Sequence, residues 1–174
     1  MDELIEKIRK VRIVLMDVDG VLTDGRVILG NYGDELKLFD IQDGHGLVML
    51  RRAGLKTVMV SGRKSRINQK RAKEVKVCKV YQNAHDKLKV YEKILRKFHV
   101  TDEQVCYIAD DLIDLPALRR AGWAVAVRNA VPEVKAAAHY VTEKKGGRGA
   151  VREVADLILK TQEKWDEVTM RYAR

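Results

Sequence analysis

The stretch Arg12-Ile-Val-Leu-Met-Asp-Val-Asp-Gly20 decides the fold of this chain. Four consecutive apolar residues, with no polar residue between them, are typical of a strand that is covered on both faces, as in a parallel sheet. The run then ends in two carboxylates and a glycine, and a glycine permits a sharp turn of the backbone. Since alternate residues of a strand share a face, Asp17 and Asp19 should project the same way if the strand stays regular.

Patterns typical of helices and strands alternate along the rest of the chain. Beyond the first run, strands are predicted at 56–60, 77–81, 104–109, 123–127 and 139–141, and helices at 2–10, 43–53, 64–74, 86–98 and 150–168, with a further short helix that ends at Gly122. This order predicts one α/β domain, residues 1–174, built on a doubly wound parallel sheet.

Two segments stand apart from the alternating pattern. Residues 26–39 have β-rich arms on either side of Gly30-Asn-Tyr-Gly-Asp34, which predicts a β-hairpin inserted after the first strand. Residues 145–174 consist of a glycine-rich loop, Lys145-Gly-Gly-Arg-Gly149, followed by the C-terminal helix.

Composition narrows the class of protein. The chain has 174 residues, 46% of them hydrophobic, and only two prolines, so we expect a single compact domain rather than a disordered chain. No apolar run approaches the roughly 18 residues of a membrane span, and no signal-peptide pattern is present. We therefore expect a cytoplasmic protein without a membrane partner. The widely spaced Cys78 and Cys106 are interpreted as buried free thiols.

The formal net charge of +9 is spread along the chain and interleaved with Asp and Glu. The aromatic and basic pattern of nucleic-acid binders is missing, so we expect no nucleic-acid partner and interpret most of the charge as solvated surface. RNA binding is the alternative, and it predicts a steep salt dependence of binding. A basic protein is equally suited to phosphorylated or carboxylated metabolites.

Polar residues follow three of the predicted strands: Asp17 and Asp19, then Ser61-Gly62-Arg63, then Asp110-Asp111. The carboxyl ends of parallel strands meet at one edge of a sheet, where ligands bind in this class of fold. Carboxylates from two strands form a hard oxygen site that suits Mg²⁺. The alternative is that Asp19 and Ser61 only cap the helices that follow them.

Phosphate binding is predicted from two further features. The hydroxyl of Ser61 and the backbone amides beside it precede a helix, and a helix N-terminus is suited to a phosphate. Lys87 opens another helix, where a cation is unfavourable toward the helix dipole. We interpret Lys87 as a phosphate-binding residue, with a solvated lysine as the alternative.

The run Asp17-Val-Asp-Gly-Val-Leu-Thr-Asp-Gly25, with Ser61-Gly-Arg63, Lys87 and Asp110-Asp-Leu-Ile-Asp114, resembles the haloacid dehalogenase superfamily of phosphatases. The hairpin, Phe39-Asp-Ile-Gln-Asp-Gly-His-Gly46 and Gly146-Gly-Arg-Gly-Ala-Val-Arg-Glu153 further resemble its family of 3-deoxy-D-manno-octulosonate 8-phosphate phosphatases, which act in lipopolysaccharide core biosynthesis. Two residues depart from the pattern: Gln42 stands where many members have a basic residue, and Ala109 replaces a glycine.

The resemblance implies a role for each motif. Asp17 attacks phosphorus and forms an aspartyl phosphate, while Asp19 protonates the leaving oxygen and then activates water. Mg²⁺ is held by Asp17, Asp110 and the backbone carbonyl of Asp19, with Asp111 and Asp114 supporting this shell. The substrate, a sugar acid phosphate, contacts Asp19, Asp40, Ile41, Gln42, Asp43, Gly44, Ser61, Gly62, Arg63, Arg71, Lys87 and Arg148.

The resemblance also implies an architecture. The sheet is of the Rossmann-like haloacid dehalogenase type, with the small hairpin 26–39 in place of a cap domain, and the chain forms a homotetramer. In such a tetramer Arg148 reaches over a neighbouring subunit's site, whereas a flexible linker is the alternative for residues 145–149.

Besides RNA binding, three rival functions stay open at this stage. A phosphatase for another sugar acid phosphate is the nearest one. A non-catalytic oligomerisation module, related to domains fused to sugar-acid nucleotidyltransferases, would not need both Asp17 and Asp19. A phospho-receiver domain carries its phosphorylated aspartate on a middle strand rather than in a first-strand Asp-x-Asp-Gly motif.

Overall fold

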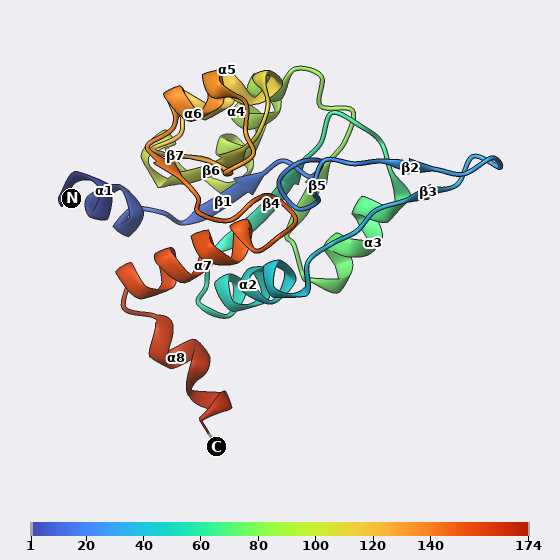
Figure 1. Cartoon of the computed structure of the whole chain (residues 1–174). Coiled ribbons are helices and arrows are strands. Elements are labelled where there is room, and N and C mark those ends of the chain that lie inside the picture. The colour runs from blue at the N-terminus through green and yellow to red at the C-terminus, as the bar shows by residue number, and fades with distance from the viewer. Residues whose placement is uncertain (1, 174) are drawn as a thin grey trace.

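Six strands, each parallel to its neighbours, form the central sheet of the computed structural model, which describes residues 2–173 (Figure 1). The strands are β1 (Ile13–Met16), β4 (Lys56–Val60), β5 (Lys79–Tyr81), β6 (Val105–Ala109), β7 (Trp123–Ala126) and β8 (Tyr140–Val141). Their spatial order is β5-β4-β1-β6-β7-β8, so β1 lies in the middle, between β4 and β6. The strand order reverses at β1, which makes its carboxyl end the switch point of the sheet.

Helices cover both faces of this sheet. They are α1 (Asp2–Arg9), α2 (Ile41–Arg52), α3 (Arg66–Glu74), α4 (Lys87–Phe98), α5 (Leu115–Leu118), α6 (Pro132–Ala137), α7 (Ala150–Thr161) and α8 (Trp165–Thr169), with 3-10 turns η1 (Asp102–Gln104), η2 (Leu112–Asp114) and η3 (Met170–Tyr172). Figure 1 shows α4, α5 and α6 on one face and α2 and α7 on the other. The predicted doubly wound parallel sheet is confirmed.

The first strand is buried as its sequence predicts. All four residues of β1 have no exposed surface, and they pair with β4 on one side and β6 on the other. Burial of such side chains from both faces is the main source of stability for a sheet of this kind. Asp17, the residue directly after β1, is consequently held at the end of a well-packed strand.

The segment after β1 contains a short hairpin that extends away from the body (Figure 1). Its strands, β2 (Ile28–Leu29) and β3 (Glu35–Leu36), pair antiparallel over two residues each, so regular pairing is shorter than the predicted arms. Apolar side chains along it are exposed, with Tyr32 at the turn 98% exposed. In the part of the chain that the structure describes, no helix is both long and apolar enough to cross a membrane.

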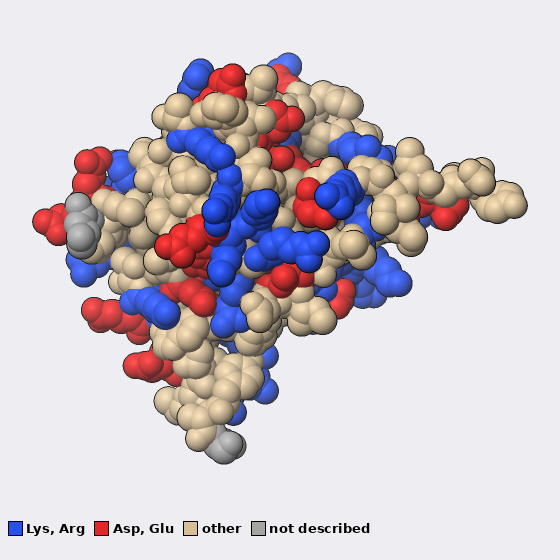
Figure 2. Space-filling view, in the orientation of Figure 1, with Lys and Arg blue, Asp and Glu red and all other residues tan. Residues whose placement is uncertain are grey.

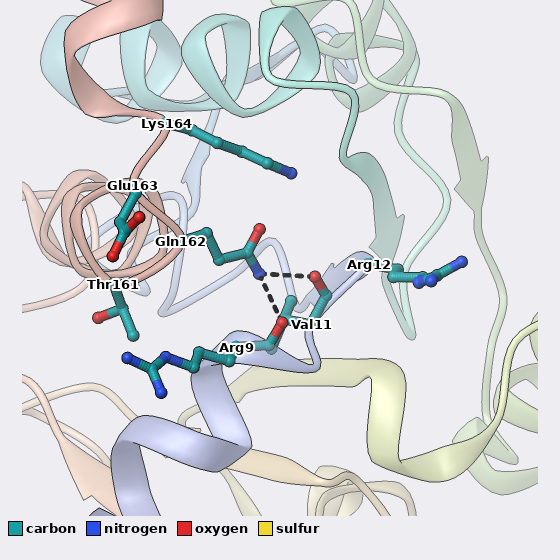
Figure 3. A pocket seen from close by; sticks show the side chains of 7 residues that line it. All are labelled: Arg9, Val11, Arg12, Thr161, Gln162, Glu163 and Lys164. Carbon is teal, nitrogen blue, oxygen red and sulfur yellow. Dashed lines mark hydrogen bonds between the residues drawn. The ribbon is translucent and has the colours of Figure 1, made fainter.

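The C-terminal helix is shorter than predicted. Instead of running through 150–168, α7 ends at Thr161, and Glu163 adopts a left-handed backbone with φ 56°. The backbone amide of Lys164 then donates to the carbonyl of Leu159, which closes the helix end before α8 begins. The side-chain amide of Gln162 donates to the carbonyls of Ile8 and Val11 and ties this end of α7 to the segment before β1. Figure 3 draws the bond to Val11, together with a longer one to the carbonyl of Arg9.

Two smaller predictions also need correction. Cys78 is exposed rather than buried, because it precedes the edge strand β5, whereas Cys106 on β6 is buried and free as predicted. Helix α2 begins at Ile41 instead of residue 43, because the carboxylate of Asp40 caps it by accepting from the amides of Gln42 and Asp43.

Candidate active site

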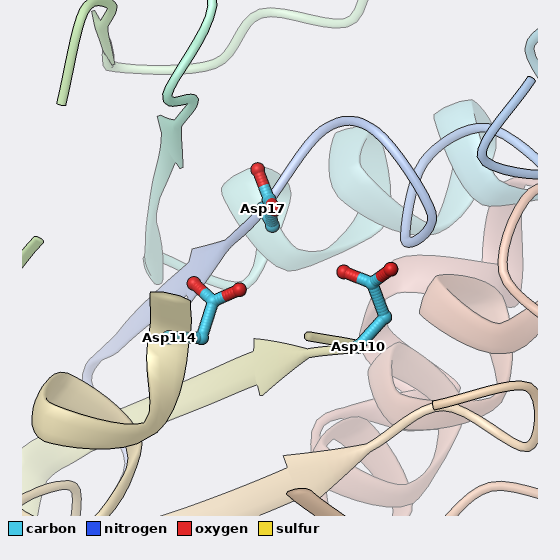
Figure 4. A group of neighbouring side chains, drawn as sticks. All are labelled: Asp17, Asp110 and Asp114. Atoms are coloured by element: carbon cyan, nitrogen blue, oxygen red, sulfur yellow. The ribbon is translucent and has the colours of Figure 1, made fainter. Parts of the chain in front are cut away.

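Three carboxylates meet at the carboxyl edge of the sheet (Figure 4). Asp17 follows β1, Asp110 follows β6 and Asp114 ends η2; one oxygen from each lies within 4.8 Å of the others. We call these three residues the acidic cluster. Oδ1 of Asp110 and Oδ2 of Asp114 are buried and accept no hydrogen bond within residues 2–173. A buried and unsatisfied carboxylate oxygen is unfavourable, so this hard oxygen set fits a divalent cation such as Mg²⁺.

The two predicted supporting residues differ in position. Asp114 is itself a member of the acidic cluster rather than a residue behind it. Asp111 is exposed, and its Oδ1 accepts a hydrogen bond of 2.7 Å from the amide of Leu112, which caps η2. In the structure Asp111 therefore has a capping contact, while Asp114 offers an oxygen to the cluster.

A buried lysine lies beside the acidic cluster. The Nζ of Lys87 is 2.9 Å from Oδ2 of Asp17 and 2.6 Å from Oδ1 of Asp114, and its side chain has no exposed surface. The hydroxyl of Tyr107 donates to the same Asp114 oxygen at 2.8 Å. The alternative of a solvated lysine is wrong: Lys87 supplies one buried positive charge to three carboxylates.

The pKa values of the carboxyl groups in the acidic cluster are raised, in agreement with this shortage of positive charge. Burial raises the pKa of Asp110 to about 7, and the neighbouring charge of Asp17 adds to the effect. The pKa of Asp114 is raised to about 7 by the same two causes, against the attraction of Lys87. Burial also raises the pKa of Asp17. A bound divalent cation would favour the ionised carboxylates and supply the compensating charge.

The turn after β1 brings the backbone close to the cluster. Gly20 has φ +96°, and a Cβ at this position would lie 1.9 Å from Oδ2 of Asp110. The turn therefore requires glycine both for its conformation and for the close approach of Asp110. Within the turn the amide of Val18 donates to Oδ1 of Asp17 at 2.6 Å, which fixes the carboxylate.

Asp19 does not cap a helix. Its side chain is 20% exposed, and its Oδ1 accepts a hydrogen bond of 2.7 Å from Nζ of Lys37, which follows β3. Sequence reasoning missed Lys37, because a single lysine between Leu36 and Leu38 has the pattern of a solvated residue on a hairpin. The sequence does carry one signal for its position. Leu36 and Leu38 flank Lys37, and because neighbouring residues of a strand point to opposite faces, Lys37 lies on the face opposite these exposed leucines.

Ser61 lies at the carboxyl end of β4, the neighbour of β1. Its side chain is buried; the hydroxyl donates to the carbonyl of Arg63 at 3.1 Å and accepts from the Arg63 amide at 3.2 Å. The helix that follows is capped by Ser65, whose hydroxyl accepts from the amide of Ile67, so the capping alternative for Ser61 is wrong. Gly62 is half-buried in this turn, and Arg63 extends to Glu35 of the hairpin at 3.1 Å.

The residues at the start of α2 that were predicted to contact the substrate differ in exposure to solvent. Asp43 is buried, and its carboxylate accepts from the amides of Gly149 at 3.2 Å and Arg152 at 2.8 Å. Asp43 therefore caps α7 from a neighbouring helix, which leaves it little freedom to contact a ligand. Ile41 and Gln42 are exposed on the first turn of α2.

Arg71 is held against the same helix start. It donates to the carbonyl of Asp40 at 2.8 Å and lies over the ring of Phe39, 5.4 Å from its centroid. Gly44 makes this possible, because a Cβ there would lie 2.3 Å from a guanidinium nitrogen of Arg71. The structure thus gives Arg71 and Gly44 a packing contact.

The glycine-rich loop before α7 packs on its own chain. The amide of Gly146 donates to Oδ1 of Asn129 at 2.7 Å, and that of Gly147 donates to the carbonyl of Val21 at 2.9 Å. A Cβ on Gly146 would lie 1.7 Å from the carbonyl oxygen of Gly20. These glycines are needed for close approach to the turn after β1, so the alternative of a flexible linker does not describe them.

Arg148 projects from this loop between two hollows. One, of about 330 Å³, is lined by Asp24, Leu38, Phe39, Asp40, Ile41, Gly147 and Arg148. The other, of about 520 Å³, has both basic and acidic walls, among them Lys144, Arg152, Glu153 and Asp156. Figure 2 shows basic side chains gathered around this loop, with acidic ones beside them.

Comparison with known proteins agrees with this geometry. The model of the haloacid dehalogenase-like hydrolase family matches residues 64–154. The 3-deoxy-D-manno-octulosonate 8-phosphate phosphatase of Yersinia pestis is 42% identical over 168 residues, which cover 97% of this chain and 90% of that protein. The Escherichia coli (strain K12) enzyme of the same name is 40% identical over 165 residues, 95% of this chain and 88% of that protein.

Solved structures that are similar to this chain are also described as phosphatases. The crystal structure of the Moraxella catarrhalis 3-deoxy-D-manno-octulosonate 8-phosphate phosphatase, in complex with a magnesium ion, a phosphate ion and a KDO molecule, superposes with a TM-score of 0.96. It is 38% identical in sequence, and the match covers 99% of each chain. The crystal structure of a probable YrbI family phosphatase from Pseudomonas syringae pv. phaseolica 1448a has a TM-score of 0.97 at 40% identity, covering 100% of this chain and 99% of that one.

Proposed function

This chain belongs to the haloacid dehalogenase-like hydrolases, and on that premise we propose that it is the phosphatase of 3-deoxy-D-manno-octulosonate 8-phosphate in lipopolysaccharide core biosynthesis. The observation that carries the proposal is the buried contact of Lys87 with Asp17 and Asp114, inside a cluster of three carboxylates. Such a set holds a divalent cation and a phosphoryl group together, which is what phosphoryl transfer requires.

The reaction proceeds in two displacements. In the first, a carboxylate oxygen of Asp17 forms a bond to phosphorus while the bond to the sugar oxygen breaks, and Asp19 gives that oxygen its proton. In the second, Asp19 takes a proton from water, the water oxygen attacks phosphorus, and Asp17 and inorganic phosphate are released. Asp19 is suited to both steps because its side chain is partly open to solvent, unlike the buried members of the cluster.

Mg²⁺ would be held by Asp17, Asp110 and the backbone carbonyl of Asp19, with the free oxygen of Asp114 available beside them. When bound it neutralises charge on the phosphoryl oxygens and aligns them for attack. Lys87 stabilises the same charge from the protein side, and Ser61 with Gly62 provides polar contacts at the end of β4.

Contacts to the sugar acid are part of the proposal. We assign Arg63 to them because it is exposed and follows Ser61, and Gln42 because it is exposed and lines a hollow together with Arg148. Arg148 is assigned because it also lines a hollow beside Asp40 and Ile41. A guanidinium is suited to the substrate carboxylate, which it can bind in a bidentate manner. Arg71 would contribute charge more than direct contact, since its guanidinium is engaged with Asp40.

The assembly and location also belong to the proposal. The hairpin exposes Ile28, Leu29, Leu36 and Leu38, and this apolar surface supports association between subunits. We propose that the assembly is a homotetramer. A neighbouring subunit would then close a site that has no cap domain. We expect the enzyme in the cytoplasm, with no nucleic acid or membrane as partner.

The test is phosphate release from a panel of sugar phosphates in the presence of Mg²⁺. We expect 3-deoxy-D-manno-octulosonate 8-phosphate to have the highest kcat/KM, and Asp17→Asn to lower turnover by roughly 10⁴-fold in a folded protein. Asp166→Asn, an exposed change on α8, is the matched control and should retain activity. A folded Asp17→Asn protein with a tenth of the wild-type rate would overturn the covalent mechanism. A higher kcat/KM for another sugar acid phosphate would overturn the substrate.

A further inference from the structure

We propose that Lys37 is a positioning residue for Asp19, and that it makes the hairpin part of the catalytic apparatus. This inference rests on the proposed phosphatase function. Its starting point is the burial of Lys37: the side chain has no exposed surface, although Leu36 and Leu38 on either side are largely exposed. A lysine is seldom buried completely unless its charge is paired.

The ammonium of Lys37 makes two hydrogen bonds. It donates to Oδ1 of Asp19 at 2.7 Å and to Oδ1 of Asn68 on α3 at 3.2 Å. The carboxylate of Glu35 lies 3.8 Å away and adds a weaker attraction. The bond from Lys37 is the one that the Asp19 carboxylate accepts within residues 2–173, so Lys37 decides how that carboxylate is turned.

The partner on α3 is itself fixed. Asn68 is fully buried, and its amide nitrogen donates to Oε1 of Gln82 at 3.4 Å, which sets its oxygen toward Lys37. The same Gln82 oxygen accepts from the amide of Ser65 at 2.6 Å. A chain of hydrogen bonds thus runs from the end of β5 through α3 to Lys37 and finally to Asp19. Held in this way, Asp19 keeps one oxygen engaged and the other free to exchange a proton at the reacting centre.

This arrangement has a consequence for catalysis. An Asp19 carboxylate without its partner would be free to rotate, because its side chain is partly exposed and water can replace the lost bond. The protein should then fold while proton transfer slows, since general acid–base catalysis depends on placement within hydrogen-bond reach. The rate should therefore decrease only for the reaction steps in which Asp19 transfers a proton.

The experiment compares Lys37→Met with wild type on two substrates. An alkyl phosphate such as the sugar acid phosphate has a poor leaving group and needs a proton for the first displacement. p-Nitrophenyl phosphate has a good one and needs Asp19 only when water attacks the aspartyl phosphate. With the sugar phosphate we expect kcat to fall by about 10²-fold, within the range that acid–base catalysis contributes, with little change in KM. With p-nitrophenyl phosphate we expect a rapid burst of one nitrophenol per site, followed by slow turnover.

Three further variants make the outcome decisive. Lys37→Arg, which keeps a cation, should recover part of the rate. In an Asp19→Asn background, Lys37→Met should add no further loss, because both changes act through one carboxylate. Lys73→Met, an exposed lysine of α3, is the matched control for charge and should behave as wild type.

The result that overturns the inference is a folded Lys37→Met protein that lacks the burst and loses both activities equally, or one that keeps the wild-type kcat. A rise in KM alone would also overturn it, because it would make Lys37 a substrate-binding residue. Failure of the wild-type protein to release phosphate from any monoester would instead overturn the proposed function, so the two failures are distinguishable.

Discussion

The Nζ of Lys87 lies 2.9 Å from Oδ2 of Asp17, and the Lys87 side chain is completely buried. Burial by itself disfavours the charged lysine, but the nearby charges of Asp17 and Asp114 outweigh it and raise the pKa of Lys87. The lysine is therefore a permanent cation at the switch point of the sheet. It holds Asp17, the proposed nucleophile, in place and would compensate part of the charge that a phosphoryl group brings.

Removal of this cation should destabilise the protein in a way that depends on metal. We expect Lys87→Met to lower the free energy of unfolding by about 3–5 kcal/mol without metal, because it leaves buried carboxylates unpaired. Added Mg²⁺ should recover part of the loss by binding the same carboxylates. Urea unfolding with and without Mg²⁺ measures both effects. The matched control is Lys89→Met, whose exposed side chain pairs with Asp86 alone among residues 2–173. Equal stability of both variants would contradict the prediction.

Turnover should require a divalent cation. After exhaustive chelation we expect activity to disappear, to return with Mg²⁺, and to be inhibited by Ca²⁺. Calcium prefers more ligands and longer bonds than magnesium, so it would misplace the phosphoryl group relative to Asp17. Phosphate release in titrations of each ion provides the measurement, and a chelated enzyme with full activity would rule out the metal site.

The stability of the protein should depend on pH through Asp43. Burial raises the pKa of this carboxyl to about 6 from 3.8, against the hydrogen bonds from Arg152 and Gly149 that favour the ionised form. The folded state therefore favours the protonated carboxyl. Its contribution to stability is fully present below about pH 4 and is lost as pH rises through about 6, a change of about 3 kcal/mol.

The measurement is thermal or urea unfolding of wild type and Asp43→Asn between pH 4 and 7. The amide does not ionise, so the variant should lack this part of the pH dependence while its oxygen still accepts one hydrogen bond from the start of α7. The difference in stability between the two proteins should thus move in favour of the variant as pH rises. A difference that is constant over this interval would argue against ionisation of Asp43.

Arg148→Ala should affect the turnover of a substrate that carries a carboxylate more than that of one without. We expect lower kcat/KM for the sugar acid phosphate, because the variant lacks the guanidinium that we propose binds the substrate carboxylate. We expect little change for p-nitrophenyl phosphate, which has no carboxylate. Arg119→Ala, an exposed change beyond α5, is the matched control. Equal effects of Arg148→Ala on both substrates would leave Arg148 without a role in recognising the sugar acid.

The sequence by itself determined the α/β architecture and the edge at which the motifs meet. The apolar side chains of β1 are all removed from water only when both faces of the strand are buried. The aspartates that follow this run therefore lie at the end of the strand. The alternation of helices and strands then brought Ser61 and Asp110 to the two neighbouring strands. These patterns are local in sequence. In a parallel sheet they also fix where the motif residues lie, because the carboxyl ends of neighbouring strands meet at one edge.

Tertiary structure alone decided how the side chains pair. Lys37 has the sequence context of a solvated lysine, and the position of Lys87 at a helix start left that interpretation open as an alternative. Both side chains are nevertheless buried, because acceptors distant in sequence surround them. Asp43 belongs to α2 but caps α7, and the glycines before α7 are needed for contact with the turn at Gly20. No local pattern encodes these contacts, because each depends on the packing of segments that the chain brings together only when folded. Whether a charged residue is solvated, paired or catalytic follows from its neighbours in space, which sequence spacing does not specify.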